Sequence, residues 1–181
     1  IRYQKIYGDP LKPQIWEDLD KFLQTRWRRE DGVVLDILAA AMDTGGHHTD
    51  AVYRFCLDRF YRHVYAIKGR GGVETVFVSK PSTGNRVGVP LYTIGVDNGK
   101  TMVYQRLNVQ TPGPNYCHFP LDEAAGYDET YFKGLTAEKQ VVRWKKGRPT
   151  TAWELKDPNY HRNEPLDCRD YALAALEIAN P

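Results

Sequence analysis

The feature that most constrains the fold of this chain is an apolar run that stops at an acid and then turns at two glycines. Residues 37–56 read ILAAAMDTGGHHTDAVYRFC, so the run ends at Asp43 and an amphipathic segment follows. A continuous apolar run bounded by glycines is typical of a strand buried on both faces. An acid at the carboxyl end of such a strand lies where open α/β sheets bind ligands. Asp and Gly also suit turns for local reasons, so this stretch alone does not decide between a turn residue and a functional acid.

The composition is that of an ordinary globular domain. The 181 residues are 41% hydrophobic and 27% charged, with a net charge of +2. No apolar run approaches the ~20 residues that cross a bilayer. The three cysteines are widely spaced, which argues against a disulfide framework or a structural zinc site. We therefore expect one domain, residues 1–181, without a membrane span.

The hydrophobic periodicity predicts strands that alternate with helices. Strands are expected at residues 1–7, 33–42, 64–67 and 91–96, helices at 14–25, 49–61, 100–108 and 165–179, and a hairpin at 141–144 and 151–155. Residues 69–90 and 110–130 are expected to be irregular. This order indicates an α/β sheet with parallel neighbours and helical crossovers. It places Asp43 on a central strand.

A second acidic motif begins the last expected helix. Glu164 and Asp167 are three residues apart, so both can face one side of that helix. Acids are also favoured at helix N-termini by the helix dipole alone. Two-metal phosphoryl chemistry needs carboxylates from separate elements that converge on ions ~3.5–4 Å apart, and Mg²⁺ and Mn²⁺ prefer such oxygen ligands. Asp97 also follows a strand, but we interpret it as a turn residue.

Basic residues gather in three clusters. Residues 26–29 (RWRR) and 143–148 (RWKKGR) interleave basic and aromatic side chains, and Lys68-Gly69-Arg70 follows a strand. Such clusters suit phosphate contacts, although each one by itself is also ordinary solvated charge. The candidates for contact with DNA are His47, Lys68, Arg70, Lys100, Lys145 and Lys146.

Taken together, the motifs resemble the nuclease domain of lambda-like phage terminase large subunits. The matching segments are residues 7–10 (YGDP) with Trp16, 39–46 (AAAMDTGG), 52–56 (VYRFC), 66–69 (AIKG), 92–97 (YTIGVD) with Lys100, 118–120 (HFP) and 162–168 (RNEPLDC). They follow one order along nearly the whole chain, which is more specific than any single motif.

The resemblance implies an RNase H-like fold, with a mixed central sheet flanked by helices. It implies a metal-dependent endonuclease that hydrolyses double-stranded viral DNA concatemers during genome packaging, in the host cell cytoplasm, with two Mg²⁺ or Mn²⁺ ions. The expected partners are duplex DNA, a small terminase subunit and a portal or procapsid, and no membrane. Residues 1–181 contain no Walker-type loop, so ATP would serve only a motor domain elsewhere in the parent protein.

Carried over by position, the resemblance makes Asp43, Asp167 and Glu164 both the catalytic acids and the metal ligands. The family has a further Asp on its first strand, and residues 1–7 hold no acid. We therefore expect the first strand to be lacking here and the metal site to be incomplete, which can leave this chain by itself inactive. Two alternatives stay open: a DNA-binding or docking module without activity, and another RNase H-like enzyme such as a transposase or resolvase.

Overall fold

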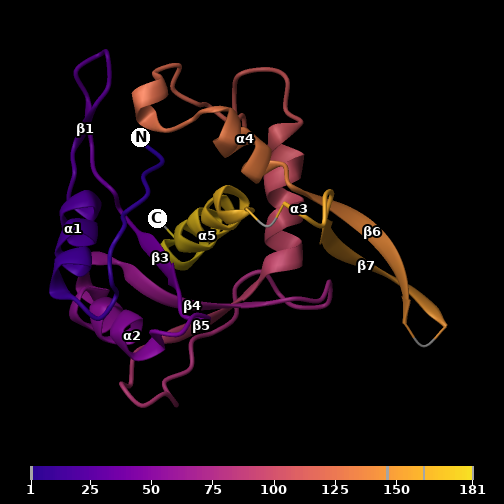
Figure 1. The fold of residues 1–181 in the computed structure, drawn as a ribbon, viewed down its shortest axis with the longest axis horizontal. Helices are drawn as coiled ribbons and strands as arrows, with labels where there is room; N and C mark the ends of the chain where they lie inside the picture. The colour runs from indigo at the N-terminus through magenta and orange to yellow at the C-terminus, as the bar shows by residue number, and fades with distance from the viewer. Residues whose placement is uncertain (1, 146, 161, 181) are drawn as a thin grey trace.

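The centre of the computed structural model is a three-stranded parallel sheet, and the structure describes residues 2–145, 147–160 and 162–180 (Figure 1). The strands are β3 (Ala40–Asp43), β4 (Val64–Arg70) and β5 (Leu91–Gly95), in the order β3-β4-β5. Asp43 is opposite Ile67 in the register of β3 and β4. Because the strands are parallel, their carboxyl ends all lie at the same end of the sheet, and Asp43 is at that end.

Helices and two hairpins surround the sheet. The remaining elements are α1 (Pro13–Leu23), β1 (Trp27–Arg28), β2 (Val34–Leu35), α2 (Thr49–Asp58), the 3-10 helices η1 (Phe60–Arg62) and η2 (Glu123–Ala125), α3 (Val96–Leu107), α4 (Glu129–Leu135), β6 (Glu138–Lys145), β7 (Arg148–Leu155) and α5 (Glu164–Ala179). β1 pairs with β2, and β6 with β7, both antiparallel. None of the described helices is long and apolar enough to cross a membrane. The fold is therefore α/β, with a parallel sheet and flanking helices.

The two faces of the sheet pack against different helices, because side chains alternate along a strand. Ala66 belongs to a hydrophobic cluster with Phe55 of α2, and Trp16 of α1 packs against the same cluster. The next residue, Ile67, belongs to another cluster with Ala174 of α5. The sheet therefore lies between α1 and α2 on one side and α5 on the other (Figure 1).

One predicted strand is absent from the described residues, and another is broken in two. Residues 2–7 form no strand, and residue 1 lies outside the described residues. This segment is held instead near α4, where the N–H of Tyr3 donates to the Ala125 carbonyl and its ring packs edge-on against Tyr131. The strand predicted at residues 33–42 is broken into β2 and β3, and Leu38 between them is 72% exposed. As a result β3 is short and lies at the edge of the described sheet rather than at its centre.

The remaining expectations differ mainly at the ends of elements. α1, α2, β5 and α5 lie close to their predicted ranges, whereas β4 continues to Arg70 and the hairpin of β6 and β7 is longer than predicted. α4 was missed. The crossover from β3 to β4 is helical, as expected, but the connection from β4 to β5 holds no helix. Residues 78 and 82 of that connection form antiparallel bridges with β5.

α3 begins at Val96, directly after β5, instead of at residue 100. The helix can begin there because the preceding loop is held by its first turn: the Asp97 carboxylate accepts the N–H of Gly72, and the Asn98 amide donates to the Thr75 carbonyl. A side chain at Gly95 would meet the Thr75 carbonyl oxygen at 2.6 Å, so the close approach requires glycine. Asp97 is therefore a residue of the first turn of a helix rather than of a free turn.

Candidate functional site

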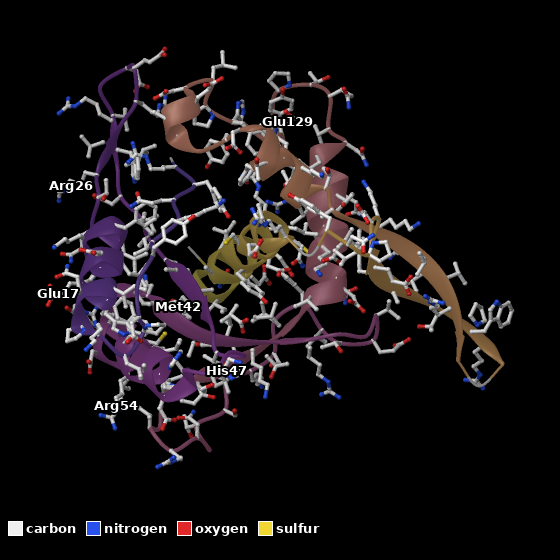
Figure 2. The ribbon with its side chains drawn as sticks, viewed as in Figure 1. Glu17, Arg26, Met42, His47, Arg54 and Glu129 are labelled. Atoms are coloured by element: carbon white, nitrogen blue, oxygen red, sulfur yellow. The ribbon has the colours of Figure 1, made fainter. Side chains whose placement is uncertain are left out.

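Asp43 faces the layer that contains α5. Met42 packs into the cluster of α1 and α2, and Ala41 packs into the cluster of α5, so alternation directs the Asp43 side chain to the α5 side. The carboxylate is exposed, and its Oδ1 accepts the N–H of Gly45 at 3.0 Å. Thr44 is buried and donates its hydroxyl to the Ile67 carbonyl, which anchors the turn to β4. In Figure 2 the labelled Met42 and His47 mark the two sides of this turn.

Asp167 lies in the first turn of α5. Its Oδ2 accepts from the side-chain amide of Asn163 at 3.2 Å, and its Oδ1 lies 3.7 Å from the Lys100 amine. The same Asn163 amide donates to Oε1 of Glu138 at 2.7 Å. Asp167 is therefore held in one orientation by groups from α3 and from the residue that precedes α5.

A buried lysine links three elements behind Asp167. The Lys100 amine on α3 lies 2.8 Å from both carboxylate oxygens of Glu138, the first residue of β6. Both residues are buried, with 9% and 5% of their surfaces exposed. In a buried pair of this kind, the loss of either partner leaves an unpaired buried charge, which is strongly destabilising. Lys100 thus fixes the position of α3 relative to β6 and to the start of α5.

The pKa of Asp167 is raised. Burial is the main cause, and the Glu138 and Asp43 carboxylates raise the pKa further, whereas the Lys100 ammonium lowers it. Asp43 also contributes, after burial, to the raised pKa of the Tyr171 hydroxyl. Asp43 and Asp167, which were predicted from separate motifs, therefore lie near enough for the Asp43 carboxylate to add slightly to the raised pKa of Asp167.

A further acid, Asp170, lies close to Lys100, Glu138 and Asp167. The sequence analysis did not single it out. Asp170 is fully buried, and neither of its carboxyl oxygens has a hydrogen-bond partner in the described part of the chain. Burial raises its pKa to about 7, against the lowering effect of Lys100. Its carboxyl packs directly on Gly99, where an added Cβ would meet Oδ1 at 1.6 Å. The available signal was its place on the buried stripe of α5 between Leu166 and Ala174.

Glu164 is exposed in the first turn of α5. Within the described residues, no three or more Asp, Glu, His or Cys side chains are grouped as a metal site. The described residues thus place Asp43 and Asp167 on the side of the sheet that α5 covers but do not assemble them with Glu164 into a three-ligand set. Two carboxylates fit a Mg²⁺ or Mn²⁺ ion that keeps most of its waters, because such ions often bind one or two carboxylates and substrate phosphates.

The candidates for DNA contact are distributed over several surfaces. His47 is exposed after β3, and Lys68 and Arg70 are exposed near the end of β4. Lys100 is buried in its ion pair with Glu138, which does not suit contact with a polyanion. Lys145 ends β6, and Lys146 lies outside the described residues.

The parallel sheet with its flanking helices defines an α/β protein, and Asp43 lies at the carboxyl end of one of its strands, where such sheets often bind ligands. The chain belongs to the family described as "Terminase large subunit gpA, endonuclease domain", which it matches over residues 1–181. This confirms the resemblance that the sequence motifs indicated.

Two relatives are similar to this chain over almost its entire length. The terminase large subunit of Escherichia phage lambda is 34% identical over 183 residues, which cover 99% of this chain and 28% of that protein. The terminase large subunit of Enterobacteria phage P21 is 29% identical over 185 residues, which cover 96% of this chain and 27% of that protein. The chain therefore spans about a quarter of the length of these relatives. No solved structure matches it.

Proposed function

We propose that this chain is a metal-dependent endonuclease domain that hydrolyses phosphodiesters of double-stranded viral DNA during genome packaging. The observation that carries the proposal is the placement of Asp43, at the end of β3 on the side that α5 covers, together with Asp167 in the first turn of α5. Membership of a terminase endonuclease family supports this chemistry over that of a transposase or resolvase. An RNase H-like arrangement of the sheet, action in the host cytoplasm and partnership with a small terminase subunit and a portal belong to the same proposal.

In this proposal Asp43 and Asp167 hold the metal ion, Mg²⁺ or Mn²⁺, between β3 and α5. When bound, the ion would polarise a phosphate oxygen and lower the pKa of an attacking water. Asn163 and Lys100 hold the Asp167 carboxylate in place, and Gly45 holds one oxygen of Asp43. A second ion would need ligands beyond these two acids, and Glu164, which is exposed in the same helical turn as Asp167, is our candidate for one of them.

The test replaces each acid by its amide. Asp43→Asn and Asp167→Asn should each abolish Mn²⁺-dependent nicking of a supercoiled plasmid by the full-length protein, a loss of at least about a hundredfold if the acids stabilise the transition-state charge. Asp58→Asn is the matched control, because Asp58 is an exposed acid at the end of α2. Calorimetry with Mn²⁺ alone gives a readout that does not depend on activity. Full cleavage by both variants would disprove the assignment.

One observation favours a second function, a DNA-binding or docking module without activity. The described residues contain no group of three potential metal ligands. In that case Mn²⁺ would not bind detectably to the wild-type protein, and the two amide variants would bind duplex DNA as the wild type does. If the wild-type protein binds Mn²⁺ and the Asp43→Asn variant does not, the result supports the nuclease over the inactive module.

A further inference from the structure

The hairpin of β6 and β7 projects away from the rest of the fold (Figure 1). Each strand has eight residues, which corresponds to a length of roughly 25 Å. Its base is fixed to α3, because the Trp153 indole N–H donates to the Asp97 carbonyl at 3.0 Å and its ring packs on Tyr104. The Lys100–Glu138 ion pair adds a second attachment at the start of β6. The base of the hairpin is therefore firmly attached, and its outer half lines a pocket with Gly72, Val73 and Glu74 of the loop that follows β4.

The outer half of the hairpin exposes apolar side chains. Trp144 is 73% exposed and Val142 is 63% exposed. In the register Trp144 is opposite Pro149 and Val142 is opposite Thr151, so these four residues share one face of the ribbon. An exposed tryptophan at the end of an arm is costly in water and suggests a surface that contacts a partner.

The opposite face of the same half carries two arginines, Arg143 and Arg148. Residues 142–151 contain four Lys and Arg residues and no Asp or Glu. Arg143 is opposite Thr150, and Arg148 follows the turn. Arg143 pairs with Glu154 in an exposed contact, and such contacts are weak enough for a phosphate to compete. A partner that accepts both faces must offer negative charge and flat apolar groups.

We propose that the outer half of this hairpin is a duplex-DNA-binding arm, which enters a groove of the substrate with Trp144 at its front. A two-stranded ribbon fits the major groove of B-DNA, which is about 12 Å wide. Arg143 and Arg148 would contact phosphates on the walls of the groove, while the Trp144 ring would pack on bases or sugars. This inference rests on the proposed function, because it takes duplex DNA as the substrate.

The test measures binding of a fluorescein-labelled 30-bp duplex by anisotropy in EDTA, where no cleavage occurs. Trp144→Ala should weaken binding on the order of tenfold, the size of effect found for aromatic contacts to bases. Trp144→Phe should restore most of the affinity. The double variant Arg143→Gln/Arg148→Gln should weaken binding and reduce the slope of log Kd against log salt by roughly 1.8, because two phosphate contacts are lost.

The control is Arg54→Gln, which removes one exposed positive charge from α2, far from the hairpin (Figure 2). It should leave the affinity within about twofold of the wild type and lower the slope by less than half a unit. Thermal unfolding of every variant checks that the exposed positions do not affect folding. If both hairpin variants bind DNA with the affinity and salt slope of the wild type, the proposal that this hairpin binds DNA is wrong. If the Asp43 and Asp167 variants then still lose cleavage, the proposed nuclease stands without it.

Discussion

Asp20 and Asp170 are both acids withdrawn from water, but their surroundings differ. The Asp20 side chain, on α1, is 20% exposed, and one oxygen accepts from Arg59 at 2.7 Å and from Arg62 at 2.8 Å. Burial alone would raise its pKa, but the two arginines lower it below the usual value. Asp170 is fully buried and has no hydrogen-bond partner among the described residues.

The difference lies in the balance of charge. Two cations surround Asp20, so that region gains stability from its acid. Around Lys100, one cation faces the acids Glu138, Asp167 and Asp170, and the balance is negative. A buried excess of acid costs free energy of folding unless a cation or a proton neutralises it. The first arrangement ties α1 to the segment that follows α2, and the second has an excess of negative charge.

The largest effect should come from removing the buried cation of Lys100. Lys100→Met leaves Glu138 and Asp167 without their positive partner and should cost about 3–5 kcal/mol in the free energy of unfolding. The double variant Lys100→Met/Glu138→Leu should recover much of that loss, because it leaves no unpaired charge on Glu138. Urea denaturation of the single and double variants measures both the loss of stability and its recovery. A double variant less stable than the single one would show that the pair does not act as a unit.

The next effect concerns the proton on Asp170. Because its pKa in the folded state is about 7 rather than 3.8, the unfolded state releases the proton first as the pH rises. The stability should therefore fall between about pH 4 and 7, by on the order of 4 kcal/mol from this group. Asp170→Asn cannot lose a proton, so its stability relative to the wild type should rise over that range. The measurement is denaturation at pH 5, 6, 7 and 8, and a constant difference would contradict the prediction.

The opposite sign is expected for Asp20. Its lowered pKa means that its stabilising effect is present above the usual value of 3.8 and is lost as the pH falls through its folded-state value. Asp20→Asn should cost about 1–3 kcal/mol at pH 7, because Arg59 and Arg62 lose a charged acceptor. The variant should also lose less stability on acidification below pH 4 than the wild type does. Parallel acid titrations followed by circular dichroism would show whether it does.

The smallest effect should come from an ion pair on the surface. Arg26 lies 3.1 Å from Asp36, and their side chains are 76% and 54% exposed. Arg26→Gln should change the free energy of unfolding by less than about 1 kcal/mol, because water screens both charges. Thermal unfolding in low and high salt would measure this. If Arg26→Gln cost as much stability as Asp20→Asn, solvent exposure would not explain why the two sites differ.

The acids that end or begin an element were predictable from local sequence. Asp43 follows an apolar run and precedes two glycines, and Asp167 lies in the first turn of a helix that has Pro165 near its start, so each is marked by its neighbours in the chain. The contact between Lys100 and Glu138 joins residues that are 38 positions apart and left no local mark. The strand predicted at residues 33–42 is present only in part, as β2 and β3, because periodicity measures hydrophobicity and cannot detect whether a strand has a neighbour with which to pair.

The ion pair between Lys100 and Glu138 has a consequence for how this sequence can change over generations. A neutral residue at either position alone leaves a buried charge unpaired, whereas a joint replacement by two apolar residues avoids that cost. Natural variants should therefore alter the two positions together, and a lineage that lost one partner would be under pressure to lose the other. We expect an alignment of relatives to show positions 100 and 138 covarying, with few sequences that retain only one of the two charges.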